Sequence, residues 1–358
     1  MSARSLARGF MSWCEDRFAL KPILNYMHKK EVPQHEHTIW YYTGSSILLF
    51  LFIQIFTGIL LALYYRPTLE GANASVGRIM TELPLGWLVR SIHSWSATFM
   101  IATAIIHMLA IWFTKSYRKP REVTWMTGFL LLVCSMMFGF TGYLLPWDDL
   151  SLAATKVGTN IPKAIPVVGT WVTQLLRGGD DVTGDTLTRF FIFHVCVLPL
   201  LVFAIVAVHI LLVQKEGMSI PLKDEVEKKK LPWLPFWPNF IIRETMIWLV
   251  LLGFLLTISV LFAPSLEPTA DLMAPAPEGV KPEWYFLFLF QTLKIFPANI
   301  GPVSGEFVAV VLILIAVVAI FFMPFLEGKP LGKRGKLVTY GGILGVIYAI
   351  AMSIWSLL

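Results

Sequence analysis

The sequence contains little charge for its length and few cysteines. Asp, Glu, Lys and Arg make up 15% of its 358 residues, whereas hydrophobic residues make up 56%. Ordinary soluble domains carry about 25% charged residues, so the composition excludes that class. The three cysteines are scattered, and the chain has neither a C-x-x-C-H motif nor a paired metal-ligand spacing. A covalently attached c-type haem is therefore not predicted.

Long apolar stretches take the place of the missing charge. Each is long enough to cross a bilayer as a helix, which needs about 20 residues, and each would satisfy its own backbone hydrogen bonds there. We therefore predict an all-α membrane protein with seven transmembrane helices. The predicted spans are Trp40–Leu63, Trp87–Phe113, Val123–Trp147, Phe190–Val213, Thr245–Leu266, Phe307–Leu326 and Leu337–Leu358.

The basic residues indicate how these helices cross the membrane. Residues 1–30 lack the pattern of a signal peptide, and we expect an amphipathic segment on the cytoplasmic face, with a solvated basic tail as the alternative. If the N-terminus lies inside, the inner segments hold twenty Lys and Arg residues and the outer loops nine. The positive-inside rule then favours a cytoplasmic N-terminus. The net charge of +6 points to anionic lipid, not nucleic acid.

A polar, Pro- and Trp-rich stretch divides the helices into two groups. It follows the fourth span and is typical of an interfacial linker. Two outer loops, 148–189 and 267–306, are unusually long, and their apolar content predicts short helices folded against the membrane surface. The predicted parts are an interfacial segment (1–38), a four-helix bundle (39–213), the linker (214–243) and a three-helix block (244–358).

Four histidines lie inside the apolar spans. His93 and His107 are fourteen residues apart, and His194 and His209 fifteen. Fourteen residues are close to four helical turns, or about 21 Å of rise, so each pair shares one helix face. Because the topology makes the two helices parallel, His93 pairs with His194 near the outer face and His107 with His209 near the inner face. We predict two bis-histidine haem sites, which makes the first group of helices a dihaem bundle.

The extra residue between the second pair of histidines requires a local distortion of that helix. Pro199 lies between them and gives a reason for one. A single membrane histidine is often only an interhelical hydrogen-bond partner, and a haem-free transporter with a histidine proton relay remains a rival of another class.

Glycines and basic residues around the histidines extend this hypothesis. The glycines repeat the fourteen-residue spacing on the neighbouring spans, and we expect them to give clearance to two porphyrins, although small residues are also common in membrane helix packing. Arginine or lysine at either end suits haem propionates or a simpler role as interface anchor. The residues are Gly44, Gly58, Gly128 and Gly142, with Arg90 and Arg189 for the outer haem and Lys119 and Arg121 for the inner one.

These positions together resemble the cytochrome b subunit of quinol–cytochrome c and plastoquinol–plastocyanin oxidoreductases. The resemblance covers nearly the whole chain. The histidine spacing in the fourth span and the seven-helix count are similar to the chloroplast and cyanobacterial branch, in which the polypeptide is split after that span, whereas here both halves are fused. The motifs are Gly44/Gly58, His93/His107, Gly128/Gly142, Gly142–Trp147, Thr186–Phe190, His194/His209 and Pro282–Tyr285.

The resemblance implies quinol oxidation at the outer face and quinone reduction at the inner face. Glu283 carries over as the carboxylate that accepts a quinol proton, and Tyr285 as a hydrogen-bonding or gating residue. One electron would pass to a Rieske iron–sulfur protein and the other through the outer and inner haems, which contributes to the proton motive force. A c-type cytochrome subunit, the quinone pool, a homodimeric complex and a bacterial cytoplasmic membrane are the expected setting.

Two positions depart from the family pattern. Tyr42 stands where the chloroplast-type branch has the cysteine that tethers an extra haem, so this covalent haem is not carried over. Gln214 stands where an arginine is expected after the last haem histidine, so the inner quinone site is left without residue assignments. The nearest rival function is a dihaem, quinone-reactive membrane anchor of a complex without a Rieske protein.

Overall fold

The computed structural model describes residues 3–275, 277–328 and 332–358. Lys329, one of the basic residues counted on the inner side, lies outside the described residues. Six helical segments are long and apolar enough to cross a membrane, and a shorter apolar helix makes a seventh. The predicted all-α, seven-helix architecture is confirmed. The spans are Thr38–Ala62 (η1 Thr38–Trp40 and α3 Tyr41–Ala62), α5 Gly86–Phe113, α6 Glu122–Tyr143, Gly184–Glu216, Phe236–Leu261, α14 Gly305–Phe321 and α16 Lys333–Leu357.

The ends of the predicted spans are shifted in the structure, and for the fifth and sixth spans the shift has a clear cause. The fifth, expected at Thr245–Leu266, begins at η4 (Phe236–Phe240), which is kinked at Trp237, continues as α12 (Ile241–Leu261) and ends three residues before Pro264. The predicted start, Thr245, is too late because the charged residues Arg243 and Glu244 were left out of the span, although they lie in the first turn of α12. The sixth, α14, has 17 residues and gives way to a separate short helix, α15 (Met323–Glu327). Proline lacks a backbone N–H and suits a first helical turn, which explains a new start at Pro324.

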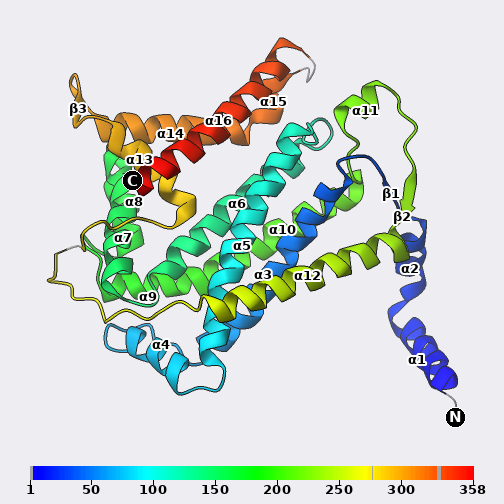
Figure 1. The fold of residues 1–358 in the computed structure, drawn as a ribbon, viewed down its shortest axis with the longest axis horizontal. Helices are drawn as coiled ribbons and strands as arrows, with labels where there is room; N and C mark the ends of the chain where they lie inside the picture. The colour runs from blue at the N-terminus through cyan, green and yellow to red at the C-terminus, as the bar shows by residue number, and fades with distance from the viewer. Residues whose placement is uncertain (1–2, 276, 329–331) are drawn as a thin grey trace.

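The long helices lie side by side, as Figure 1 shows. In it α3 packs along α5, α6 along α10, and α12 lies against α3 and α5. Phe50, Met100 and Leu255 from α3, α5 and α12 form one of the buried clusters. Helix α13 (Leu287–Ile295) packs on α16. The four histidine- and glycine-bearing helices are thereby held together as one bundle.

The N-terminal segment and the linker meet at the predicted inner end of this bundle. Helices α1 (Ala3–Phe18) and α2 (Leu20–Lys29) extend away from it (Figure 1) and expose large apolar side chains such as Phe10 and Trp13. Strand β1 (Glu31–Pro33) pairs antiparallel with β2 (Trp233–Pro235) of the linker. The linker also contains α11 (Leu222–Val226).

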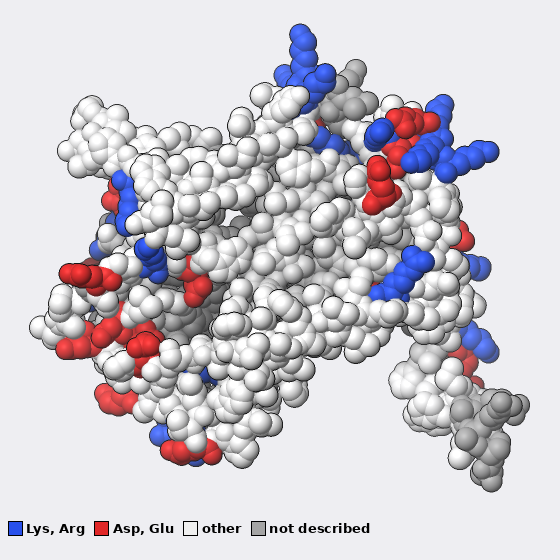
Figure 2. Space-filling view, in the orientation of Figure 1, with Lys and Arg blue, Asp and Glu red and all other residues white. Residues whose placement is uncertain are grey.

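The loops at the opposite, outer end form short helices, as the sequence predicted. They are α4 (Ala72–Thr81), α7 (Asp149–Asn160), η2 (Ile161–Ala164), α8 (Val168–Arg177), η5 (Trp284–Phe286) and a small hairpin of β3 (Asn299–Ile300) and β4 (Val303–Ser304). Acidic side chains gather over this end, whereas the middle of the molecule is nearly free of charge (Figure 2). That uncharged band is the surface that a bilayer core requires.

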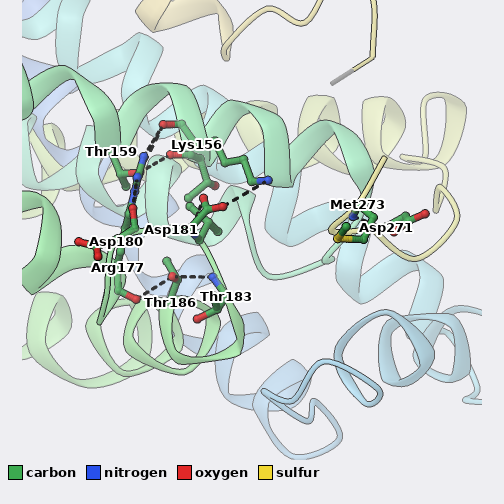
Figure 3. A network of polar contacts seen from close by, with 11 residues as sticks. Lys156, Thr159, Arg177, Asp180, Asp181, Thr183, Thr186, Asp271 and Met273 are labelled. Atoms are coloured by element: carbon green, nitrogen blue, oxygen red, sulfur yellow. Dashed lines mark hydrogen bonds and ion pairs between the residues drawn. The ribbon is translucent and has the colours of Figure 1, made fainter. Parts of the chain in front are cut away.

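Buried Arg177 fixes the loop between α6 and the fourth span. Its guanidinium donates to the Thr159 hydroxyl at 2.7 Å and to the carbonyls of Lys156 and Asp180 at 2.8 Å each (Figure 3). The hydroxyl of Thr186 donates back to the Arg177 carbonyl at 2.7 Å. Through its side chain and its carbonyl, this one residue joins α7, α8 and α9 (Gly184–Ile192).

The fourth span is distorted where the histidine spacing requires it. Helix α9 passes into a π turn, η3 (Phe193–Val197), and then into α10 (Leu198–Glu216), with Pro199 in its first turn. Because Pro199 cannot donate a backbone hydrogen bond, the wider π turn is tolerated there. A π turn takes up one extra residue. The fifteen residues from His194 to His209 therefore present their rings as fourteen do in α5, and the predicted distortion is confirmed.

Candidate haem and quinone sites

The structure brings His93 and His194 together, as the pairing from topology predicted. Their ring centres are 6.3 Å apart and the ring planes are inclined by 70°. Two imidazole–metal bonds of about 2.0–2.1 Å, with roughly 1.1 Å from each nitrogen to its ring centre, add up to about 6 Å. The outer pair therefore has the separation that one metal ion between two imidazoles needs, and it fits the iron of a haem.

Each of the four histidines is held by a threonine hydroxyl. The Nδ1 atom lies 2.8–3.1 Å from a threonine Oγ1, and each of these hydroxyls also donates to a carbonyl of its own helix or the turn before it. The threonine has one hydrogen to donate, so it accepts the Nδ1–H and leaves Nε2 with its lone pair, the tautomer that binds a metal. The pairs are Thr43–His107, Thr57–His93, Thr127–His209 and Thr141–His194.

The glycines that follow these threonines lie against the imidazole rings. A Cβ at Gly142 would be 2.6 Å from His194 Cε1, at Gly128 3.0 Å from His209, at Gly58 3.3 Å from His93 and at Gly44 3.4 Å from His107. Porphyrin clearance was the predicted role and stays a prediction. The Thr-Gly dipeptide, repeated at fourteen-residue spacing, was the signal missed in the sequence, because only its glycines were interpreted.

The inner pair borders a cavity of 430 Å³. His107 and His209 line it together with Gly44 and Gly128, and it reaches to the N-terminal segment and the linker. This volume lies within the range of about 300–1,000 Å³ for ligand sites. Arg121 also lines it, donates to the Glu216 carbonyl at 2.9 Å and keeps its buried Nε without a partner among the described residues. An unpaired buried donor fits a ligand that carries a carboxylate, such as a haem propionate.

Arg90 and Arg189, predicted beside the outer haem, hold loops in this structure. Arg90 donates to the carbonyls of Pro264 at 2.9 Å and Ser265 at 3.2 Å, and Arg189 to that of Leu175 at 3.0 Å. Both therefore have a structural role, and their contact with propionates stays a prediction. Among the residues that the structure describes, no contact of the Lys119 side chain supports its predicted role, which stays a prediction.

The two departures from the family pattern lie at the inner end. Tyr42 is buried and stacks on Phe240, with ring centres 4.7 Å apart and planes inclined by 16°. The Tyr42 side chain therefore fills the space between α3 and the start of α12. Gln214 accepts from Lys30, which lies next to α2, and both line the inner cavity. The N-terminal segment thus supplies a cation close to the position where the arginine is missing.

Glu283 and Tyr285 lie beside α6 at the level of the outer pair. The Tyr285 hydroxyl packs on Gly139, where a Cβ would be 2.0 Å from Oη, and Gly139 is one turn from the glycine that meets His194. Glu283 immediately precedes η5, and burial raises the pKa of its carboxyl. Burial also raises the pKa of Tyr285. A carboxylate with a raised pKa can exchange a proton near neutral pH.

Both outer loops are joined beside Glu283. Asn73 on α4 donates to the carbonyl of Pro146 at 3.1 Å and to that of Glu267 at 3.0 Å. The backbone N–H of Ala270 donates to the Trp147 carbonyl at 3.0 Å, and that of Asp271 to Asp149 Oδ1 at 2.8 Å. The loop after α6 and the loop after α12 therefore form one frame around the outer site.

Comparison with known proteins gives matches along most of the chain. A family model described as cytochrome b/b6/petB matches residues 27–217, and one described as cytochrome b(C-terminal)/b6/petD matches residues 269–356. The chain is 43% identical over 340 residues to the cytochrome bc complex cytochrome b subunit of Chlorobaculum thiosulfatiphilum, which covers 94% of this chain and 78% of the relative. It is 45% identical over 210 residues to cytochrome b6 of Stigeoclonium helveticum, covering 59% of this chain and 97% of that one.

A solved structure agrees with these matches. A chain of a hyperthermophilic respiratory Complex III superposes with a TM-score of 0.85 and 29% sequence identity, covering 97% of this chain and 91% of that chain. The first family model ends at residue 217, in the first residues of the linker, and the second begins after the linker at residue 269, so one polypeptide carries both parts. The chain therefore belongs to the cytochrome b/b6 family, in fused form, and is a haem-binding membrane subunit of a quinol-oxidising electron transfer complex.

Proposed function

We propose that the protein binds two b-type haems, the outer one through His93 and His194 and the inner one through His107 and His209. The observation that carries this proposal is the fourfold threonine–histidine arrangement, because it leaves Nε2 of every ring free to bind iron. When bound, two such haems supply one-electron transfer across the membrane. The protein's part is to fix the four rings at two depths and in one tautomer.

The outer site is proposed to oxidise quinol. Glu283 accepts a proton from the quinol hydroxyl, because its partly buried carboxylate has a raised pKa and so holds the proton more strongly than an exposed one. Tyr285 closes the wall against Gly139 and offers its hydroxyl as a hydrogen-bond partner. The frame formed by Asn73 keeps both loops in place. The cavity beside the inner pair is proposed to receive quinone for reduction, with Arg121 beside the propionates.

The proposed setting is a bacterial cytoplasmic membrane with a cytoplasmic N-terminus. A Rieske iron–sulfur protein and a c-type cytochrome are the proposed partners, in a homodimeric complex. The six apolar spans and the basic inner segments support this orientation. Labelling of intact cells with a membrane-impermeant thiol reagent tests it. Asp180→Cys should react and Glu227→Cys should not; the reverse pattern contradicts the orientation.

Haem content tests the ligand assignment directly. The complex is purified with His194→Leu or His209→Leu, and haem per protomer is measured together with the reduced-minus-oxidised spectrum. Each variant should retain one of two b-type haems. His28→Gln, at an exposed position on α2, is the control and should retain both. Full haem content in either ligand variant contradicts the assignment, and the absence of b-type absorption from the unaltered complex defeats the haem proposal.

A further inference from the structure

A second cavity opens at the inner end, between α5, α11 and the start of α16. Its volume is 710 Å³, and we call it the α5–α16 groove. Ile106, Leu109 and Phe113 line it at positions three and seven residues apart, which places them on one face of α5. Ile106 is 45% exposed and Phe113 41%. An apolar helix face at the end of a membrane span is a surface that suits an acyl chain.

Two lysines from different elements line this groove. Lys223 belongs to α11 and Lys336 to the first turn of α16. Both are exposed, and neither forms an ion pair within the described residues. Of the described residues that line the groove, Glu227 is the one carboxylate. The groove therefore carries a surplus of positive charge where α5 leaves the membrane.

The other carboxylates nearby are already paired with other cations. Asp224 lies 3.5 Å from Lys229, Glu225 pairs with Arg118, and Glu327 lies 2.5 Å from Lys115. None of them is left to neutralise Lys223 or Lys336. A negatively charged group that arrives from the membrane would complete the charge balance.

We propose that the α5–α16 groove is a binding site for one anionic phospholipid. Its phosphate lies between Lys223 and Lys336, and one acyl chain runs along Ile106, Leu109 and Phe113. A quinone fits the apolar floor less well, because its neutral head would leave both ammonium groups without a counter-charge. The lipid would connect the linker to the last helix, two parts of the chain that are far apart in sequence.

The test measures phospholipid bound to the purified complex by native mass spectrometry. Delipidated complex is titrated with phosphatidylglycerol or phosphatidylcholine, and Lys223→Gln/Lys336→Gln is compared with Lys228→Gln/Lys230→Gln. The control removes the same charge from the linker outside the groove lining. The unaltered complex and the control should bind one phosphatidylglycerol per protomer at least fivefold more tightly than phosphatidylcholine. The groove variant should lose this preference.

A second variant separates lost charge from lost space. Thr339→Trp, on the α16 wall of the groove, keeps both lysines and should also abolish the tight site. Unchanged haem content shows that each variant is folded. Equal binding by the groove variant and the control overturns the proposal, as does equal affinity for the two lipids or the release of a quinone instead of a phospholipid from this site.

Discussion

The outer and inner histidine pairs are held by the same types of residue, threonine and glycine, but lie in different surroundings. Beside the outer pair, Asn73 and Asp149 hydrogen-bond two loops into one frame. Beside the inner pair, a cavity of 430 Å³ remains, and Arg121 Nε has no partner there among the described residues. An unsatisfied buried polar atom costs about 1–3 kcal/mol. The outer loops are thus joined by the protein's own hydrogen bonds, whereas the cavity beside the inner pair offers the Arg121 donor to a ligand.

This difference is consistent with the proposed chemistry of the two ends. A frame that holds Glu283 and Tyr285 in place suits proton removal from a quinol, where the position of the acceptor decides the rate. An open cavity suits a site that takes up quinone and bulky propionates. The repeated Thr-Gly units then explain how two different sites keep the same iron ligands.

The largest expected effect comes from substitution of the glycines, and it differs between the outer and the inner histidine pair. Gly142→Ala places Cβ 2.6 Å from His194 Cε1, whereas Gly44→Ala places it 3.4 Å from His107. The first contact is shorter than carbon atoms tolerate, since optimal separations are about 3.5–4.0 Å. We expect Gly142→Ala to lose the outer haem and Gly44→Ala to retain both, as measured by haem per protomer. Full occupancy in Gly142→Ala would show that α6 and the π turn η3 can separate.

The second effect compares the contributions of two buried charged side chains to stability, one at each end of the molecule. At the inner end Lys115 and Glu327 form an ion pair of 2.5 Å with side chains 8% and 1% exposed. Glu327→Gln leaves the lysine charge buried, and we expect a loss of about 3–5 kcal/mol in unfolding free energy. At the outer end Arg177→Met leaves neutral carbonyls unpaired, which costs about 1–3 kcal/mol. Thermal unfolding of the purified complex measures both.

An exposed ion pair is the control for this measurement. Lys215 lies 3.5 Å from Glu216, with its side chain 76% exposed. Such a pair contributes about 0–1 kcal/mol, so Lys215→Gln should leave the unfolding temperature nearly unchanged. If Glu327→Gln destabilises the complex no more than Lys215→Gln does, the inner end is held by apolar packing alone.

The sequence predicted the transmembrane part well because the membrane imposes simple rules. Length and hydropathy located all seven helices, and the spacing of four histidines with the basic residues of the loops paired His93 with His194 correctly. The one-residue excess in the fourth span, read together with Pro199, predicted the distortion that appears as the π turn. These features depend on the local periodicity of the sequence and on the depth of each residue along the membrane normal.

The remaining features depend on contacts between distant segments, which periodicity does not encode. Asn73 gave no sign that it would join the loops beside Glu283, and Arg177 was counted only as an outer charge. Arg90 was expected at the haem but holds the chain after α12. The threonine of each Thr-Gly unit was visible in the sequence, but its hydrogen bond requires a second helix to be in place.

The third effect concerns Glu283 at the outer site. Removing a proton acceptor slows a reaction by about 10²–10⁴-fold, so Glu283→Gln should reduce quinol oxidation about 100-fold. Only the ionised carboxylate accepts a proton, and burial raises its pKa. The rate of quinol oxidation should therefore fall as the pH decreases, and the fall should occur at a pH above the ordinary glutamate pKa of about 4.3. This fall of the rate at low pH should be absent in Glu283→Gln.

A glutamate in the same loop provides the control for Glu283. Glu278 is exposed, and Glu278→Gln should change neither the rate nor its pH dependence, both measured by cytochrome c reduction with the intact complex. An unchanged rate in Glu283→Gln would contradict the proposed role of Glu283 as the proton acceptor of the outer site. The outer and inner sites would then differ less than proposed.

The smallest effect is the closest test of the difference between the outer and inner pairs, because the two variants change the same residue type on the same helix, α6. Thr141→Val and Thr127→Val each remove the acceptor of a histidine Nδ1–H, at the outer and inner pair respectively. Loss of such a partner weakens metal binding about 10–100-fold. We expect about tenfold faster haem release from the outer site in Thr141→Val, measured by transfer to a haem acceptor protein. Thr127→Val should release haem less rapidly than that, because water in the inner cavity can replace the hydroxyl. Equal release from both sites would mean that the surroundings of the two pairs do not alter how their ligands are held.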